Sequence, residues 1–154
     1  MNRPEETGMS LIDTEQVQAR MALVDEHVRC ENRHDLEAVM ATFGADARFD
    51  DEPWGDHRTD RAGVRSYYTD LLRALPDLVI EVIHRHAARD SIVLEVVIRG
   101  THRGPWRGLP ARAATSGFPC AVCTRSTPPT GWQASGSTMT ARRCSSSWAS
   151  STSP

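Results

Sequence analysis

The chain lacks several features that would narrow its class quickly. It has no lysine, so all 18 basic residues are arginine, a bias typical of GC-rich coding DNA. It has no apolar run of about 18 residues, so we expect no membrane span. Its polar, acidic N-terminus has no apolar stretch that could act as a secretion signal, and we therefore expect a cytoplasmic protein. It also has no phosphate-binding glycine loop and no nucleophile elbow.

Acidic residues are missing from the last third of the chain. Residues 1–95 sum to −9, whereas residues 96–154 carry seven arginines and no acid. A basic segment can bind nucleic acid. Here the arginines are scattered among Ser, Thr, Ala and Pro, so we expect no nucleic-acid partner.

What is present up to residue 111 predicts one α+β domain. Apolar residues at helical spacing predict helices over residues 14–30, 34–43 and 60–75. Alternating patterns predict strands over 47–50, 78–86 and 91–101, with the last two joined as a hairpin. This order suits a cone-shaped, curved antiparallel sheet wrapped around three helices. We expect residues 1–13 to be a flexible N-terminus.

Residues 112–154 follow a different pattern. They contain 17 Ser and Thr among 43 residues and three of the four cysteines, and no apolar period of 2 or 3.6 survives. A disordered low-complexity tail is one interpretation. However, Trp132, Trp148 and three cysteines are unusual in such tails.

A change of reading frame explains this composition better. Permitted codons for residues 124–154, translated in a shifted frame, allow a string with acids, strand alternation, a turn and an amphipathic segment, VLQQLG. We therefore predict a frameshift near residues 109–112, after which 112–154 is an out-of-frame, disordered tail and the closing strands are missing. The alternative is a genuine Ser/Thr-rich tail.

Residues 100–110, GTHRGPWRGLP, resemble the Gly-x-His-x-Gly…Gly-x-Pro signature of the SnoaL-like polyketide cyclase family. The polar turn at residues 32–35 is also similar, and about residues 14–110 fit. The resemblance implies the nuclear transport factor 2-like fold, a cone with a hydrophobic pocket. Cyclases of the family close a polyketide ring by an aldol step without cofactor or metal, and ketosteroid isomerases and limonene epoxide hydrolases share the cone.

The resemblance also implies candidate catalytic residues. In the related isomerases a carboxylate base precedes a proline at the end of a strand, and here Glu52 precedes Pro53. Glu52 or Asp51 is therefore a candidate general base, because burial in an apolar cavity raises a carboxylate's pKa. The plainer interpretation is a solvated loop acid within an acidic cluster. His102 matches the signature histidine, and its alternative role is structural, in a tight glycine-rich turn.

Four further residues are candidates for binding a substrate: Trp54, Tyr67, Trp106 and His84. Trp54 and Trp106 would lie at the mouth of the cone, although core packing is an equal alternative. His84 and His86 share a strand face like a pair of metal ligands, but no third ligand has a suitable spacing, so we expect no metal. The cyclases' acid/base Asp on the last strand has no counterpart, and the restored frame offers Ile there.

We therefore predict a small-molecule pocket protein, a cofactor-free cyclase or isomerase acting on a hydrophobic ketone and impaired in this form. The alternative is a non-catalytic ligand-binding or dimerisation module on the same fold. A carboxylic acid of raised pKa deep in the pocket would favour the enzyme. The expected partner is a small hydrophobic molecule, with a homodimer as the candidate assembly and no membrane or nucleic acid.

Overall fold

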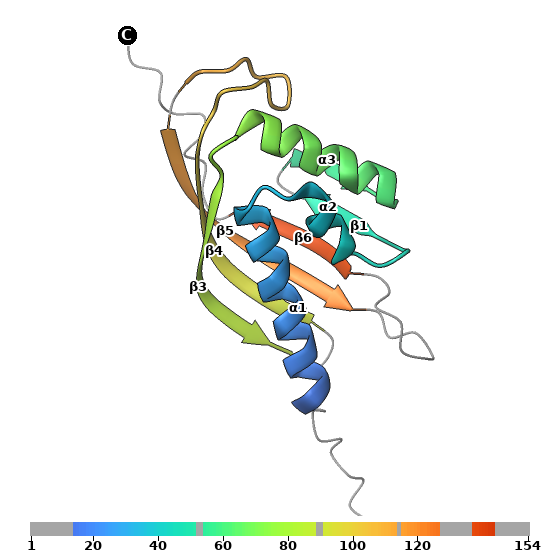
Figure 1. The fold of residues 1–154 in the computed structure, drawn as a ribbon. Coiled ribbons are helices and arrows are strands. Elements are labelled where there is room, and N and C mark those ends of the chain that lie inside the picture. Colours follow the sequence, from blue (N-terminus) through green and yellow to red (C-terminus); the bar gives the residue numbers. More distant parts are fainter. Residues whose placement is uncertain (1–13, 52–53, 89–90, 114, 127–136, 144–154) are drawn as a thin grey trace, which may run out of the picture.

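The structure, a computed structural model, describes residues 14–51, 54–88, 91–113, 115–126 and 137–143. Its three helices lie on one side of a single curved sheet, so the expected α+β fold is confirmed (Figure 1). The elements are α1 (Thr14–Asn32), α2 (Leu36–Ala41), β1 (Arg48–Asp51), β2 (Asp56–Arg58), α3 (Arg61–Ala74), β3 (Val79–Ala87), β4 (Ser91–Thr101), β5 (Thr115–Ser126) and β6 (Ser137–Arg143).

The sheet has six strands in the order β2-β1-β6-β5-β4-β3. Neighbouring strands are antiparallel except β1 and β6, which are parallel. The predicted hairpin of β3 and β4 is present, with a register shift between Val82 and His84. None of the helices in the described part of the chain has the length and apolarity that a membrane span needs.

Local sequence explains the helix boundaries. Asp60 caps α3, because its side chain accepts a hydrogen bond from the N–H of Gly63 at 2.7 Å. Asp35 caps α2 in the same way. The second helix is shorter than predicted because His34 lies before this cap, in the left-handed region at φ 57°. Strand β2 was not predicted, since three polar residues carry no alternation.

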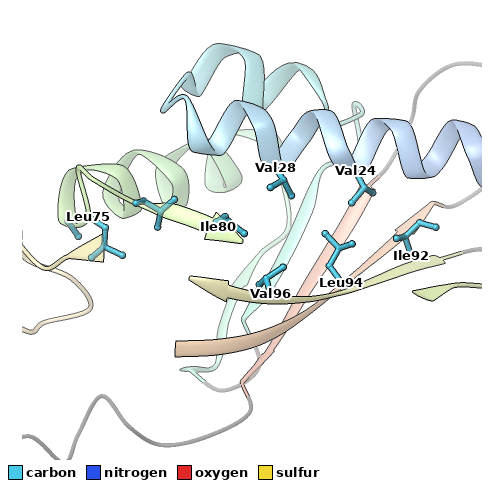
Figure 2. Close-up of a cluster of buried hydrophobic side chains, with 9 residues drawn as sticks. Val24, Val28, Leu75, Ile80, Ile92, Leu94 and Val96 are labelled. Atoms are coloured by element: carbon cyan, nitrogen blue, oxygen red, sulfur yellow. The ribbon is translucent and has the colours of Figure 1, made fainter. Parts of the chain in front are cut away.

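The core is divided between two clusters. In the first, Val24 and Val28 on α1 pack onto apolar side chains of β3 and β4, including Leu94 and Val96 (Figure 2). The second lies between α2, β1 and α3 and is rich in aromatic rings, among them Phe49 and Tyr68. The fold therefore joins an aliphatic layer near β4 to an aromatic layer near β1.

The structure differs from our expectation at the C-terminal end, where we expected the closing strands to be missing. Residues 115–126 form β5 and pair with β4 along its full length, and residues 137–143 form β6. Strand pairing uses backbone groups, so an unfavourable side-chain pattern does not by itself prevent it. Pro119, which has no N–H to donate, falls outside the part of β5 that pairs with β6. The frameshift itself stays a prediction.

Candidate functional site

The turn that follows β4 is fixed to the end of α3. The backbone N–H groups of Arg103 and Gly104 both donate to the carbonyl of Ala74, at 2.8 and 3.2 Å. A Cβ on Gly104 would lie 2.7 Å from the carbonyl oxygen of Arg73, so only glycine allows this approach. Gly100 is less constrained, because a Cβ there would meet the side chain of Leu75 at 3.4 Å, an ordinary contact distance.

The next turn directs Arg107 inward. The N–H and carbonyl groups of Trp106 and Leu109 bond to each other at 3.0 and 2.9 Å. Between them Arg107 has φ 52° and Gly108 has φ 77°. A positive φ is uncommon for a residue other than glycine. Arg107 is nevertheless largely covered, with its side chain 12% exposed.

Arg107 forms a covered ion pair with Asp51, the last residue of β1. The Nη2 atom of Arg107 lies 2.5 Å from Oδ2 of Asp51, and the Asp51 side chain is also 12% exposed. Asp51 pairs in register with Asp56 of β2, whose carboxylate lies 3.7 Å from the same Nη2. The side chains of Asp51 and Arg107 thus form a pair of opposite charges in a largely covered position.

Three aromatic rings surround the guanidinium. Its Cζ atom lies 5.0 Å from the ring centroids of Trp54 and Trp106 and 5.7 Å from that of Tyr67. These distances allow cation–π attraction. Tyr67 in turn stacks on Phe49 with centroids 4.0 Å apart. We call Asp51, Trp54, Tyr67, Trp106 and Arg107 the arginine cluster.

Burial raises the pKa of Tyr67, and the negative charge of Asp51 acts in the same direction while Arg107 opposes it. Tyr67 therefore remains a neutral phenol that can donate a proton in a hydrogen bond. The arginine cluster combines a carboxylate that can accept a proton with N–H and O–H groups that can donate hydrogen bonds. These are the components of acid–base catalysis without a metal.

A second polar group lies deeper, between the three helices. Nδ1 of His27 lies 2.6 Å from Oγ1 of Thr42, and Nε2 lies 3.1 Å from the hydroxyl of Tyr68 and 3.5 Å from Oε1 of Glu31. His27 and Glu31 are 2% and 7% exposed. Burial raises the pKa of Tyr68 and keeps its hydroxyl protonated. This network links α1 to α2 and α3.

Sequence reasoning missed this network, although one signal was available. His27 and Glu31 lie three and seven residues after Val24, so all three lie on one face of α1. Polar residues within a predicted apolar stripe indicate hydrogen-bond partners from other parts of the chain. Arg107 was missed for a different reason, because no local pattern marks an arginine that takes a positive φ before a glycine.

The structure brings together four of the predicted site residues: Asp51, Trp54, Tyr67 and Trp106. His102 lies in the stem of the same turn and is 1% exposed, and its carbonyl accepts bonds from Arg112 and Ala113 at 3.2 and 2.9 Å. A catalytic role for His102 stays a prediction. Glu52 lies outside the described residues.

His84 lies away from the cluster. It is exposed on β3, at the opposite edge of the sheet from the β1–β2 hairpin that carries Asp51. The nearby His86 bonds Glu95 at 3.1 Å. The structure does not bring His84 together with Trp54 and Trp106, and its role in binding stays a prediction. Its apolar alternation with Ile80 and Val82 suggested an inward face, but the register shift after Val82 breaks that alternation.

Asp50 precedes Asp51 but has a structural environment. Burial acts to raise its pKa, and hydrogen bonds from Arg48 and His57 at 2.8 and 2.9 Å outweigh that effect and lower it. Successive residues of a strand point to opposite faces. Of the two buried acids on β1, only Asp51 therefore faces Arg107. Within the described residues no group of three or more His, Cys, Asp or Glu is arranged to hold a metal ion.

Comparison with known proteins places this geometry in a family. No curated protein sequence matches the chain. Among solved structures, AclR of Streptomyces galilaeus, a proposed hydroxylase, is 21% identical over 83% of this chain and 76% of its own, with a TM-score of 0.69. SalBIII, an epoxide hydrolase/cyclase-like enzyme of pyran ring formation in salinomycin, is 21% identical over 87% and 95%, with a TM-score of 0.68.

A third structure, a proposed polyketide cyclase of Xanthomonas campestris, is 20% identical over 81% of this chain and 90% of its own, with a TM-score of 0.69. At these identities the likeness shows the fold. The profile of the SnoaL-like domain matches residues 24–137, from the middle of α1 to the start of β6. The chain belongs to the SnoaL-like domain family and has its nuclear transport factor 2-like fold.

Proposed function

We propose that this protein binds a small hydrophobic ketone and acts on it as a cofactor-free cyclase or isomerase, with Asp51 as the general base. The observation that carries the proposal is the ion pair of Asp51 with Arg107 among the rings of Trp54, Tyr67 and Trp106. The SnoaL-like family and its polyketide cyclase neighbours support a reaction of this type.

The first step would be the removal of a proton next to a carbonyl group. The carboxylate of Asp51 takes the proton from carbon, the C–H electron pair forms a C=C bond, and the carbonyl oxygen becomes an enolate. Asp51 would act in its ionised form, with the guanidinium of Arg107 beside it. The aromatic rings reduce contact with water, which strengthens electrostatic effects inside the site.

The chain as written would be impaired in this activity. In the family the last strands cover one side of the pocket, and residues 112–154 carry no acid to contribute to it. Our frameshift hypothesis would explain that lack. The base at Asp51 and its surroundings come from residues before 112, so the impairment would be partial.

Deuterium exchange tests the proposal without knowledge of the natural substrate. We expect the protein to accelerate exchange of the methyl protons of 2-acetylnaphthalene in deuterated water, followed by nuclear magnetic resonance (NMR). Asp51→Asn should remove most of this acceleration, since an amide is a very weak base. Asp50→Asn is the matched control, because Asp50 lies on the other face of β1 and bonds Arg48 and His57.

Two outcomes would decide between the candidate functions. Acceleration that survives in Asp51→Asn would remove Asp51 from the role of base. A wild-type protein that binds the ketone and gives no exchange would support the alternative of a non-catalytic ligand-binding module.

A further inference from the structure

We propose that the Nε–H group of Arg107 binds the ligand's carbonyl oxygen, and that the ligand is a flat, conjugated, uncharged ketone. This inference rests on the proposed function for its site and adds the group of the protein that recognises the substrate. It depends on three observations: the state of Nε, the charge around it, and the rings beside it.

The Nε atom of Arg107 is buried and has no hydrogen-bond partner within the described part of the chain. Buried N–H groups in folded proteins almost always have an acceptor. The Nη2 atom of the same side chain is occupied by Asp51. Arg58 provides a contrast, because its Nε donates to Asp56 at 2.7 Å. In Arg107, by contrast, Nη2 is occupied by a carboxylate while Nε keeps a donor without an acceptor.

The backbone at Arg107 supports a role beyond packing. The residue takes φ 52°, a region that costs free energy for a side chain with a Cβ. The neighbouring Gly108 takes φ 77° without that cost. Such strained positions concentrate at functional sites, where they place one side chain in a required direction.

The charge of the cluster selects an uncharged acceptor. Asp51 neutralises Arg107, and the carboxylate of Asp56 lies a further 3.7 Å from Nη2. Arg58 in turn pairs with Asp56 at 2.7 Å, so the two carboxylates are already balanced by two guanidinium groups and no net positive charge remains to hold a carboxylate or phosphate ligand. A ketone oxygen carries only a partial charge in the ground state, and it gains negative charge as the enolate forms. An N–H donor at that oxygen then stabilises the transition state.

The aromatic rings select a flat ligand. Trp54 and Trp106 each lie 5.0 Å from the guanidinium carbon, and Tyr67 meets Trp106 edge to face. Trp54 is 41% exposed, so the cluster reaches the surface on its side. A conjugated ligand that takes the place of Trp54 beside Arg107 would keep the stacking and supply the oxygen that Nε lacks.

A pair of ligands that differ only in the carbonyl group tests this inference on the wild-type protein. We expect 2-acetylnaphthalene to bind about tenfold more tightly than 2-ethylnaphthalene, as a hydrogen bond to a charged donor implies. Tryptophan fluorescence would report binding, since two tryptophans line the site. The Nε–H resonance of Arg107 should also shift in NMR spectra with the ketone and stay in place with the hydrocarbon.

Arg107→Lys keeps the positive charge beside Asp51 but has no Nε–H, so the preference for the ketone should disappear. Arg58→Lys is the control and should retain it; circular dichroism would confirm that both variants fold. Equal binding of the two ligands to the wild type, or an unchanged Nε–H resonance, would overturn the inference. A clear ketone preference without deuterium exchange would uphold the inference and refute the proposed catalysis.

Discussion

Replacing Gly104 by alanine should strongly destabilise the domain. The added Cβ would lie 2.7 Å from the carbonyl oxygen of Arg73 and 3.2 Å from the Cα of Ala74. Both contacts are with the backbone of α3, so no side chain can rotate to relieve them. The turn must separate from the helix, which also weakens the bonds from Arg103 and Gly104 to the carbonyl of Ala74.

The expected magnitude follows from these two effects. Overpacking costs typically about 1–3 kcal/mol, and each hydrogen bond contributes about 1 kcal/mol. We therefore expect the free energy of unfolding to fall by about 2–4 kcal/mol. Against a total stability of about 5–15 kcal/mol, this loss is large but leaves a folded population to measure.

Urea denaturation followed by circular dichroism would measure the change. Gly63→Ala is the matched control, because its Cβ would meet Asp60 Oδ1 and Arg58 Cβ at 3.4 and 3.5 Å, ordinary contact distances. Alanine also favours a helix over glycine by up to about 1 kcal/mol, so this variant should be unchanged or more stable. If Gly104→Ala unfolds within about 0.5 kcal/mol of the wild type, the close approach of the turn to α3 is wrong.

Three further predictions concern the rest of the fold. Tyr68→Phe should lower stability by about 1–2 kcal/mol in urea, because it leaves the buried ring of His27 without its partner at 3.1 Å; an unchanged midpoint would contradict this. The pKa of Asp50 is lowered from its ordinary value of 3.8, so its ionised side chain stabilises the folded protein above about pH 3.8. This stabilisation is lost as the pH falls further and Asp50 takes up a proton. Melting temperatures should therefore fall more steeply on acidification in the wild type than in Asp50→Asn, and parallel curves would refute that assignment. A frame-restored protein should show a larger cooperative core in hydrogen exchange and thermal melts, and equal protection in both proteins would favour genuine sequence after residue 111.

Sequence patterns predicted the elements that depend on burial of one face. The stripe of Val24 and Val28 and the alternation around Leu94 are produced by the same packing seen in the structure. The cap of α3 is also local, because Asp60 accepts a hydrogen bond from the N–H of Gly63, three residues later. In each case the information lies within a few residues of where it is used.

The parts of the site that were missed depend on contacts distant in sequence. The ion pair between Asp51 and Arg107 joins residues 56 positions apart, and the sequence around neither residue indicates the other. The contact of His27 with Tyr68 spans 41 positions. The resemblance supplied Asp51 and Trp106 as candidates, but it did not supply the arginine that pairs with the carboxylate of Asp51.

The candidate site and the strands β5 and β6 depend on different parts of the sequence. Every residue of the arginine cluster lies before position 112, and its turn is held by α3 and β4 rather than by β5. β5 and β6 join the sheet through backbone pairing, which most side chains permit. A frame change after residue 111 would therefore leave the proposed ketone preference intact while altering the side chains of β5 and β6. The comparison of ketone and hydrocarbon binding therefore tests the site built from residues before 112. The frame-restored protein tests the contribution of residues 112–154.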